Sequence, residues 1–132
     1  MKYEFTEDYL TGIDTIDQEH ARLFEIANET YDLMQDKLIT DKYDKIVDLI
    51  HQLQDYTKTH FDHEEAFMES INYQHIWSER HQHAMFIKRL GEVDFTKVDD
   101  KQQEYVIHLL DFLAKWLQGH IKGMDKRIAE AV

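Results

Sequence analysis

Apolar residues recur at helical spacing along four long segments of the chain. The stripes fall within residues 17–37, 42–70, 75–90 and 99–119. Apolar side chains three and four residues apart share one face of a helix, so each segment predicts an amphipathic α-helix. The sequence has no proline and only 4 glycines, so little in it interrupts a helix.

The connections between these segments are short, which favours antiparallel neighbours. We therefore expect an all-α, antiparallel up-down-up-down four-helix bundle that forms a single domain over residues 1–132. Residues 1–14 are expected to form an extended N-terminal arm, and residues 120–132 a short C-terminal segment.

Polar side chains with metal-binding atoms fall in register with the apolar stripes, at positions that should face the core. They are His20, His60, Glu64, Glu79, His83 and His120. A buried charge is costly unless it is paired or bound to a metal. His60 and Glu64, and likewise Glu79 and His83, are four residues apart, which puts each pair on one helix face. A lone core histidine is more often hydrogen-bonded than metal-bound, but polar residues on all four stripes predict a buried metal cluster.

The remaining histidines lie off the stripes and are expected to be ordinary surface side chains. They are His51, His63, His75, His81 and His108. His75 and His81 are close in sequence to the third-helix candidates, but neither has a histidine four residues away.

Composition narrows the chemistry and the partners. The chain has no cysteine, so a metal must bind through His, Asp and Glu, a set that suits iron, zinc or manganese. A net charge of −12 makes nucleic acid and anionic membranes poor partners. The first residues are polar and no long apolar run is present, so a cytoplasmic protein is expected.

Four sequence motifs, in order, resemble those of the hemerythrin family. The motifs are GIDTIDQEH at residues 12–20 followed by Leu23-Phe24, HFDHEEAFM at 60–68, the stretch from Tyr73 to His83 with Phe86, and WLQGHIKGMD at 116–125. The chain is similar to single-domain bacterial hemerythrins over nearly its whole length. The resemblance implies a non-haem di-iron centre in the bundle core, with two iron ions joined by an oxo or hydroxo bridge.

The resemblance also implies roles for particular residues. His20 and His60 would bind one iron, His83 and His120 the other, and Glu64 and Asp125 would bridge them. Phe61, Trp116, Leu117 and Ile121 fall where the family has its apolar oxygen pocket, although plain core packing explains them equally well. Asp125 lies five residues beyond His120, off the face of a regular helix. Gly119 and Gly123 flank this stretch, where a bend is expected.

One position departs from the family pattern. The family has a histidine where this chain has Glu79, four residues before His83. Glu79 is either a carboxylate ligand or a lost ligand turned to solvent. We favour ligation, because Glu79 lies within an apolar stripe and a free buried carboxylate would be costly. A third carboxylate would stabilise ferric iron and lower the reduction potential of the centre.

Several functions fit this site. The resemblance implies a protein that binds dioxygen for storage, delivery or sensing, with another small diatomic molecule or peroxide as other candidate ligands. The alternative, which Glu79 favours, is a di-iron redox enzyme that detoxifies small oxidants, namely an oxidase, peroxidase or nitric oxide reductase. Such an enzyme could take its electrons from a donor protein. Iron storage or iron sensing is a third hypothesis, which no residue singles out. The sequence assigns no catalytic side chain.

Overall fold

The computed structural model describes residues 3–36, 42–96 and 102–132, and in this part of the chain the structure is helical without strands. Four long helices dominate: α1 (Asp14–Gln35), α2 (Tyr43–Ser70), α3 (Ile76–Leu90) and α5 (Gln102–His120). Shorter helical pieces are η1 (Glu7–Tyr9), η2 (Ile121–Asp125) and α6 (Lys126–Glu130). The expected end of the first helix at residue 37 and start of the fourth at 99 lie outside the described residues.

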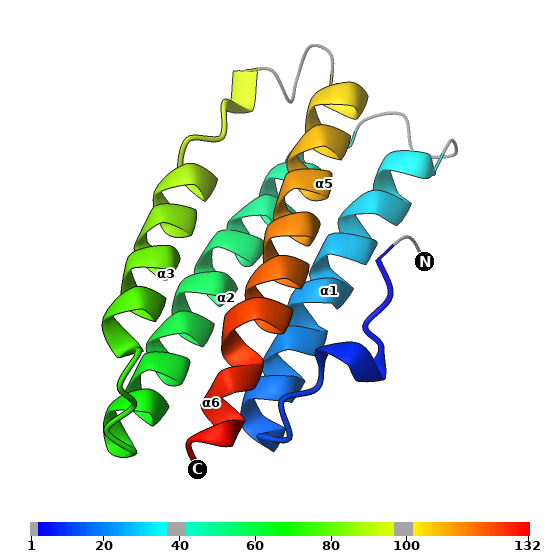
Figure 1. Cartoon of the computed structure of the whole chain (residues 1–132). Helices are drawn as coiled ribbons and strands as arrows, with labels where there is room; N and C mark the ends of the chain where they lie inside the picture. The colour runs from blue at the N-terminus through cyan, green and yellow to red at the C-terminus, as the bar shows by residue number, and fades with distance from the viewer. Residues whose placement is uncertain (1–2, 37–41, 97–101) are drawn as a thin grey trace.

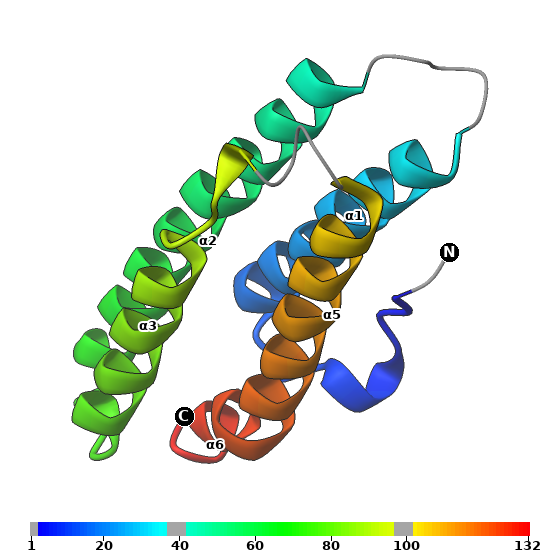
Figure 2. The ribbon, with the colours of Figure 1, turned by 90° about the horizontal axis from the view of Figure 1, so that it is seen from above.

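The long helices form a four-helix bundle, as the sequence predicted. In Figure 1 the colour runs up the bundle in α1, down in α2, up in α3 and down in α5, so consecutive helices run in opposite directions. Figure 2, the view from above, shows α2 beside α3 and α1 beside α5. Within the described residues, no helix combines the length and apolar character needed to cross a bilayer.

The N-terminal arm is tied to the first turn of α1. The Asp17 carboxylate accepts hydrogen bonds from the backbone N–H groups of Thr11 and Gly12 at 2.8 and 3.0 Å. Gly12 has a φ of 89°, in the left-handed region that favours glycine, so the chain turns there and cannot already be helical. The helix therefore begins at Asp14, three residues before the expected start, and the arm contains the 3-10 turn η1 rather than being extended throughout.

Two apolar clusters enclose the polar residues of the core. The larger cluster includes Leu23, Phe24, Ile50, Leu53, Phe86, Leu110 and Leu113, and the smaller consists of buried Met68, Tyr73 and Ile128. Along α2, His60 and Glu64 lie between Leu53 of the larger cluster and Met68 of the smaller. The candidate ligands thus form a polar layer that apolar side chains shield on both sides.

A π-helical turn interrupts the regular helix after α5. The backbone N–H of Lys126 donates to the carbonyl of Ile121, a five-residue hydrogen bond that widens this turn. His120 and Asp125 consequently share a face, and their Nε2 and Oδ1 atoms are 3.1 Å apart. Neither Gly119 nor Gly123 has a positive φ, so the π turn, rather than a special glycine conformation, brings Asp125 to the core.

Candidate metal centre

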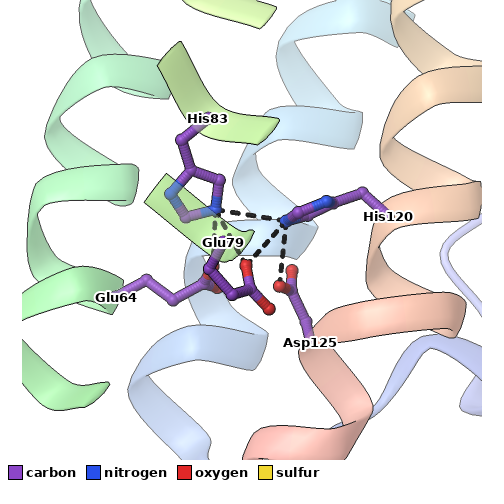
Figure 3. Close-up of side chains that lie close together, drawn as sticks. All are labelled: Glu64, Glu79, His83, His120 and Asp125. Carbon is purple, nitrogen blue, oxygen red and sulfur yellow. Dashed lines mark hydrogen bonds and ion pairs between the residues drawn. The ribbon is translucent and has the colours of Figure 1, made fainter. Parts of the chain in front are cut away.

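All seven candidate ligands of the sequence analysis meet in the polar layer, and each is at most 6% exposed. They are His20 from α1, His60 and Glu64 from α2, Glu79 and His83 from α3, His120 from α5 and Asp125 from η2. Figure 3 shows five of them pointing toward one another from three sides of the core. The set divides into two halves, which share Glu64.

The first half, called the Glu79 half below, consists of Glu79, His83 and His120. The Oε2 atom of Glu79 lies 3.2 Å from His83 Nε2 and 2.9 Å from His120 Nε2. The two Nε2 atoms are themselves 3.1 Å apart. Neighbouring donors around an octahedral ion, each ~2.1 Å from it, stand ~3 Å from one another. These three atoms therefore keep the mutual spacing of three donors on one face of such an ion.

The second half, called the His20 half below, consists of His20 and His60. Their Nε2 atoms lie 3.4 and 3.3 Å from the same atom, Glu64 Oε2. The Nε2 atom of His20 is also 3.2 Å from Asp125 Oδ2. This half therefore offers two imidazoles and one oxygen from each of two carboxylates.

Glu64 and Asp125 each present one oxygen to each half. Glu64 Oε1 lies 3.1 Å from His83 Nε2, whereas its Oε2 faces the other half. Asp125 Oδ1 lies 3.1 Å from His120 Nε2, whereas its Oδ2 faces His20. Glu64 and Asp125 are therefore the residues that could bridge a pair of ions.

The donor atoms satisfy a metal better than they satisfy each other. Buried side-chain atoms without a well-directed hydrogen bond include His60 Nε2, both oxygens of Glu64, Glu79 Oε1 and both oxygens of Asp125. Buried polar atoms in folded proteins are nearly always hydrogen-bonded, so such a concentration of atoms without a directed hydrogen bond fits a metal site. Imidazole and carboxylate together suit divalent transition metals, and the residues present thus fit a two-metal centre.

In the metal-free protein, the neighbouring carboxylates raise the pKa values of the candidate histidine ligands. Burial opposes protonation of His20, but Asp125 and Glu64 outweigh it and raise its pKa to about 9. Burial likewise opposes protonation of His83, where Glu64 and Glu79 raise the pKa to about 10. His120 follows the same pattern: burial opposes its protonation, and Asp125 and Glu79 raise its pKa to about 9. The metal-free histidines therefore hold protons that a metal must displace.

The carboxylates shift in different directions. Burial alone would raise the pKa of Glu64, but His20, His60 and His83 hold that pKa well below its usual range. The pKa of Asp125 is raised, first by its burial and then by the negative charge of Glu64. Burial also opposes ionisation of Glu79, but His120 and His83 lower its pKa, so Glu64 and Glu79 both stay ionised in the metal-free cluster.

Two further carboxylates, which the sequence analysis missed, orient ligand rings from outside. Glu19 accepts from His60 Nδ1 at 2.9 Å, and Glu65 accepts from His83 Nδ1 at 2.8 Å. Such partners fix the ring orientation and leave Nε2 free for a metal. Glu19 and Glu65 directly adjoin His20 and Glu64 inside the matched motifs, and this adjacency was the available signal.

The histidines predicted to lie on the surface are all exposed. One of them nevertheless touches the site's surroundings: His63, although 62% exposed, has its Nδ1 atom 2.6 Å from Glu19 Oε2. His63 is thus a surface histidine that also holds the partner of a candidate ligand.

Two of the expected oxygen-pocket residues, Phe61 and Trp116, pack directly on candidate ligands. Phe61 stacks on His83 with ring centroids 3.8 Å apart and parallel planes. Trp116 stacks on His120 at 4.5 Å and 12°. Leu117 and Ile121 are 1% exposed and belong to the larger apolar cluster. These side chains surround the polar layer with apolar surface.

Comparison with known proteins decides the family. Residues 11–132 match the family model described as Hemerythrin HHE cation binding domain. The chain belongs to the hemerythrin family. This hemerythrin is 37% identical to a bacteriohemerythrin of Clostridium acetobutylicum, over 94% of the chain and 96% of the relative. It is 35% identical to a bacteriohemerythrin of Pseudomonas aeruginosa, over 96% of the chain and 78% of that relative. It is 27% identical to myohemerythrin-1 of Phascolopsis gouldii, over 93% and 88% of the two chains.

Proposed function

We propose that this hemerythrin is a non-haem di-iron protein that binds dioxygen, with His20 and His60 holding one iron and His83, His120 and Glu79 the other. The observation that carries the proposal is the arrangement of the bridging carboxylates. Glu64 lies within reach of both histidine pairs, and neither of its oxygens has a directed hydrogen bond. Two ferrous ions held by these residues would supply the electrons that dioxygen accepts when it binds.

Other side chains exclude water from the centre and hold the ligand rings in place. The two apolar clusters exclude water from the polar layer, which favours a small apolar molecule over a charged one. Phe61 and Trp116 hold two ligand rings in place by stacking. The His20 half has fewer donors than the Glu79 half, so a small molecule is expected to bind beside His20 and His60.

Glu79 supports a second candidate function, a di-iron redox enzyme acting on dioxygen, peroxide or nitric oxide. Its carboxylate is fully buried and directed at two ligating nitrogens rather than at solvent. At an effective dielectric constant near 20, a unit charge ~2 Å from a metal ion is worth several kcal/mol, as an upper limit. Only part of this favours the ferric over the ferrous ion, but the direction is a lower reduction potential and faster loss of reversible binding.

Anaerobic reconstitution with ferrous iron, followed by exposure to air, tests both functions. Two irons per chain and an oxygenated spectrum that disappears on removal of dioxygen would support dioxygen binding. Immediate irreversible oxidation, with turnover of peroxide or nitric oxide above that of free iron, would favour the enzyme. A Glu79→His variant measured alongside should keep an oxygenated state for longer, and an unchanged lifetime would show that Glu79 does not set the reactivity. Iron content below one per chain would refute both functions.

A further inference from the structure

The two halves of the centre are chemically unequal, and the inequality comes from Glu79. On the Glu79 half, two imidazoles meet oxygens from three carboxylates: Glu79, Glu64 and Asp125. The ligand atoms of all five residues lie within 4.8 Å of one another. The His20 half offers two imidazoles, His20 and His60, and oxygens from two carboxylates, Glu64 and Asp125. One half therefore offers more donors and more negative charge than the other.

The position of Glu79 leaves its charge available to a metal. Its Oε1 atom is buried and has no hydrogen-bond partner, and its Oε2 atom faces His83 and His120. A metal bound to the Nε2 atoms of His83 and His120 would therefore face this carboxylate.

Carboxylate oxygen and imidazole nitrogen favour different ions. Imidazole suits zinc, copper, iron and nickel, whereas carboxylate oxygen also suits manganese, the weakest binder of the divalent series. A half with three carboxylates should compensate for the weak affinity of Mn²⁺ better than a half with two.

Resting on the proposed two-metal centre, we propose that Glu79 makes the halves fill in order: the first ion binds beside Glu79, and this half, unlike the His20 half, accepts Mn²⁺. Glu79 is thus a residue that determines metal specificity, beyond supplying a donor for iron. The two positions of this hemerythrin can then hold two different metals, manganese beside Glu79 and iron beside His20.

The test is titration of the metal-free protein with Mn²⁺ alone, with the free ion followed by electron paramagnetic resonance. One Mn²⁺ per chain should bind at least about tenfold more tightly than a second, a difference of ~1.4 kcal/mol. Two Mn²⁺ ions of equal affinity would overturn the proposal. Binding of two Fe²⁺ but no Mn²⁺ would overturn it while leaving the di-iron function standing, whereas no binding of either metal would overturn both.

Variants locate the first ion. Glu79→Gln should weaken Mn²⁺ binding by at least about 100-fold, since even an outer partner of a ligand is worth about 10- to 100-fold. The matched control Glu92→Gln removes one charge from an exposed side chain beyond α3 and should leave Mn²⁺ affinity unchanged. An equal loss of Mn²⁺ affinity in both variants would attribute the effect to net charge. Wild-type Mn²⁺ affinity in Glu79→Gln would show that Glu79 does not determine Mn²⁺ binding.

Substitutions of the histidines establish the order of filling. His20→Gln should retain one tightly bound Mn²⁺, whereas His83→Gln should lose it, and the opposite result would reverse the proposed order. Glu79→His, which restores a nitrogen donor, guards against a folding defect: it should still bind two Zn²⁺ while its Mn²⁺ affinity falls. Retention of tight Mn²⁺ binding in this folded variant would refute the role of the carboxylate.

Discussion

Loading the metal-free protein with metal should release about three protons per chain at pH 7.5. The protons come from His20, His83 and His120, whose carboxylate neighbours raise their pKa values to about 9, 10 and 9. Each imidazole is then almost fully protonated at pH 7.5, and each must give up its proton before Nε2 can bind a metal.

The size of the effect follows from the same values. A pKa of about 9 lies 1.5 units above pH 7.5, so deprotonating His20 or His120 costs on the order of 2 kcal/mol, and His83 costs more. Metal affinity should therefore rise with pH, by up to about three orders of magnitude per pH unit between pH 7 and 9, and level off above pH 10.

Calorimetric titration with Zn²⁺, which undergoes no redox change, measures this release when it is repeated in buffers of different ionisation enthalpy. Glu79→Gln should release fewer protons, because His83 and His120 lose a carboxylate that raises their pKa values. Release of fewer than one proton per chain from the wild-type protein, or affinity independent of pH, would refute this account of the metal-free cluster.

Three further perturbations test the surroundings of the centre. Because folding raises the pKa values of His20, His83 and His120, their contribution to the stability of the metal-free protein is complete below pH 6.5 and is lost as the pH rises through 9 to 10. The midpoint of thermal unfolding should therefore fall across that range. A midpoint that does not change with pH would contradict the pKa shifts. Glu65→Gln weakens the acceptor for His83 Nδ1 and should lower metal affinity by about 10- to 100-fold, measured by competition with a chelator; full affinity would make Glu65 dispensable. Gly119→Ala and Gly123→Ala should each stabilise the metal-free protein by about 0.5–1 kcal/mol in urea unfolding, since an added Cβ meets no atom within 4 Å; loss of metal binding would show that the π turn needs glycine.

The sequence predicted the bundle and six of the inward-facing polar residues, because both follow from one regularity. Positions on a regular helix that share a face with leucines must face the core, whether they hold leucine or histidine. Glu79 illustrates this: its place in the stripe of the third segment indicated burial, and the side chain is fully buried. Helical periodicity therefore predicted the buried positions wherever the backbone is a regular α-helix.

Asp125 shows where such periodicity stops. Five residues along a regular helix turn a side chain well away from His120, so the spacing alone placed Asp125 off the ligand face. Only the family motif supplied it, because the π turn that brings it back is a property of the folded backbone. The backbone does depart from a regular helix beside Gly119 and Gly123, as expected, although neither glycine has a positive φ.

Glu19 and Glu65 were missed for a different physical reason. Each adjoins a candidate ligand in sequence, but adjacent residues on a helix point in different directions. Glu19 on α1 therefore reaches across to His60 on α2, and Glu65 on α2 reaches across to His83 on α3. A partner on the next helix depends on how the helices pack, which the spacing within one helix does not encode.

In each half of the centre, a carboxylate holds one histidine ring through a hydrogen bond, and packing alone holds the other. His60 and His83 are held by carboxylates through Nδ1, whereas the Nδ1 atoms of His20 and His120 are buried without a hydrogen-bond partner. Packing holds the rings of His20 and His120 instead. The His120 ring lies flat on Trp116, and the His20 ring meets the His60 ring edge-on with centroids 4.6 Å apart. A hydrogen bond fixes which nitrogen carries the proton, and stacking fixes only the plane of the ring. Once Nε2 has lost its proton, each metal is therefore expected to meet one imidazole whose remaining proton is fixed on Nδ1 and one that takes up this tautomer on binding.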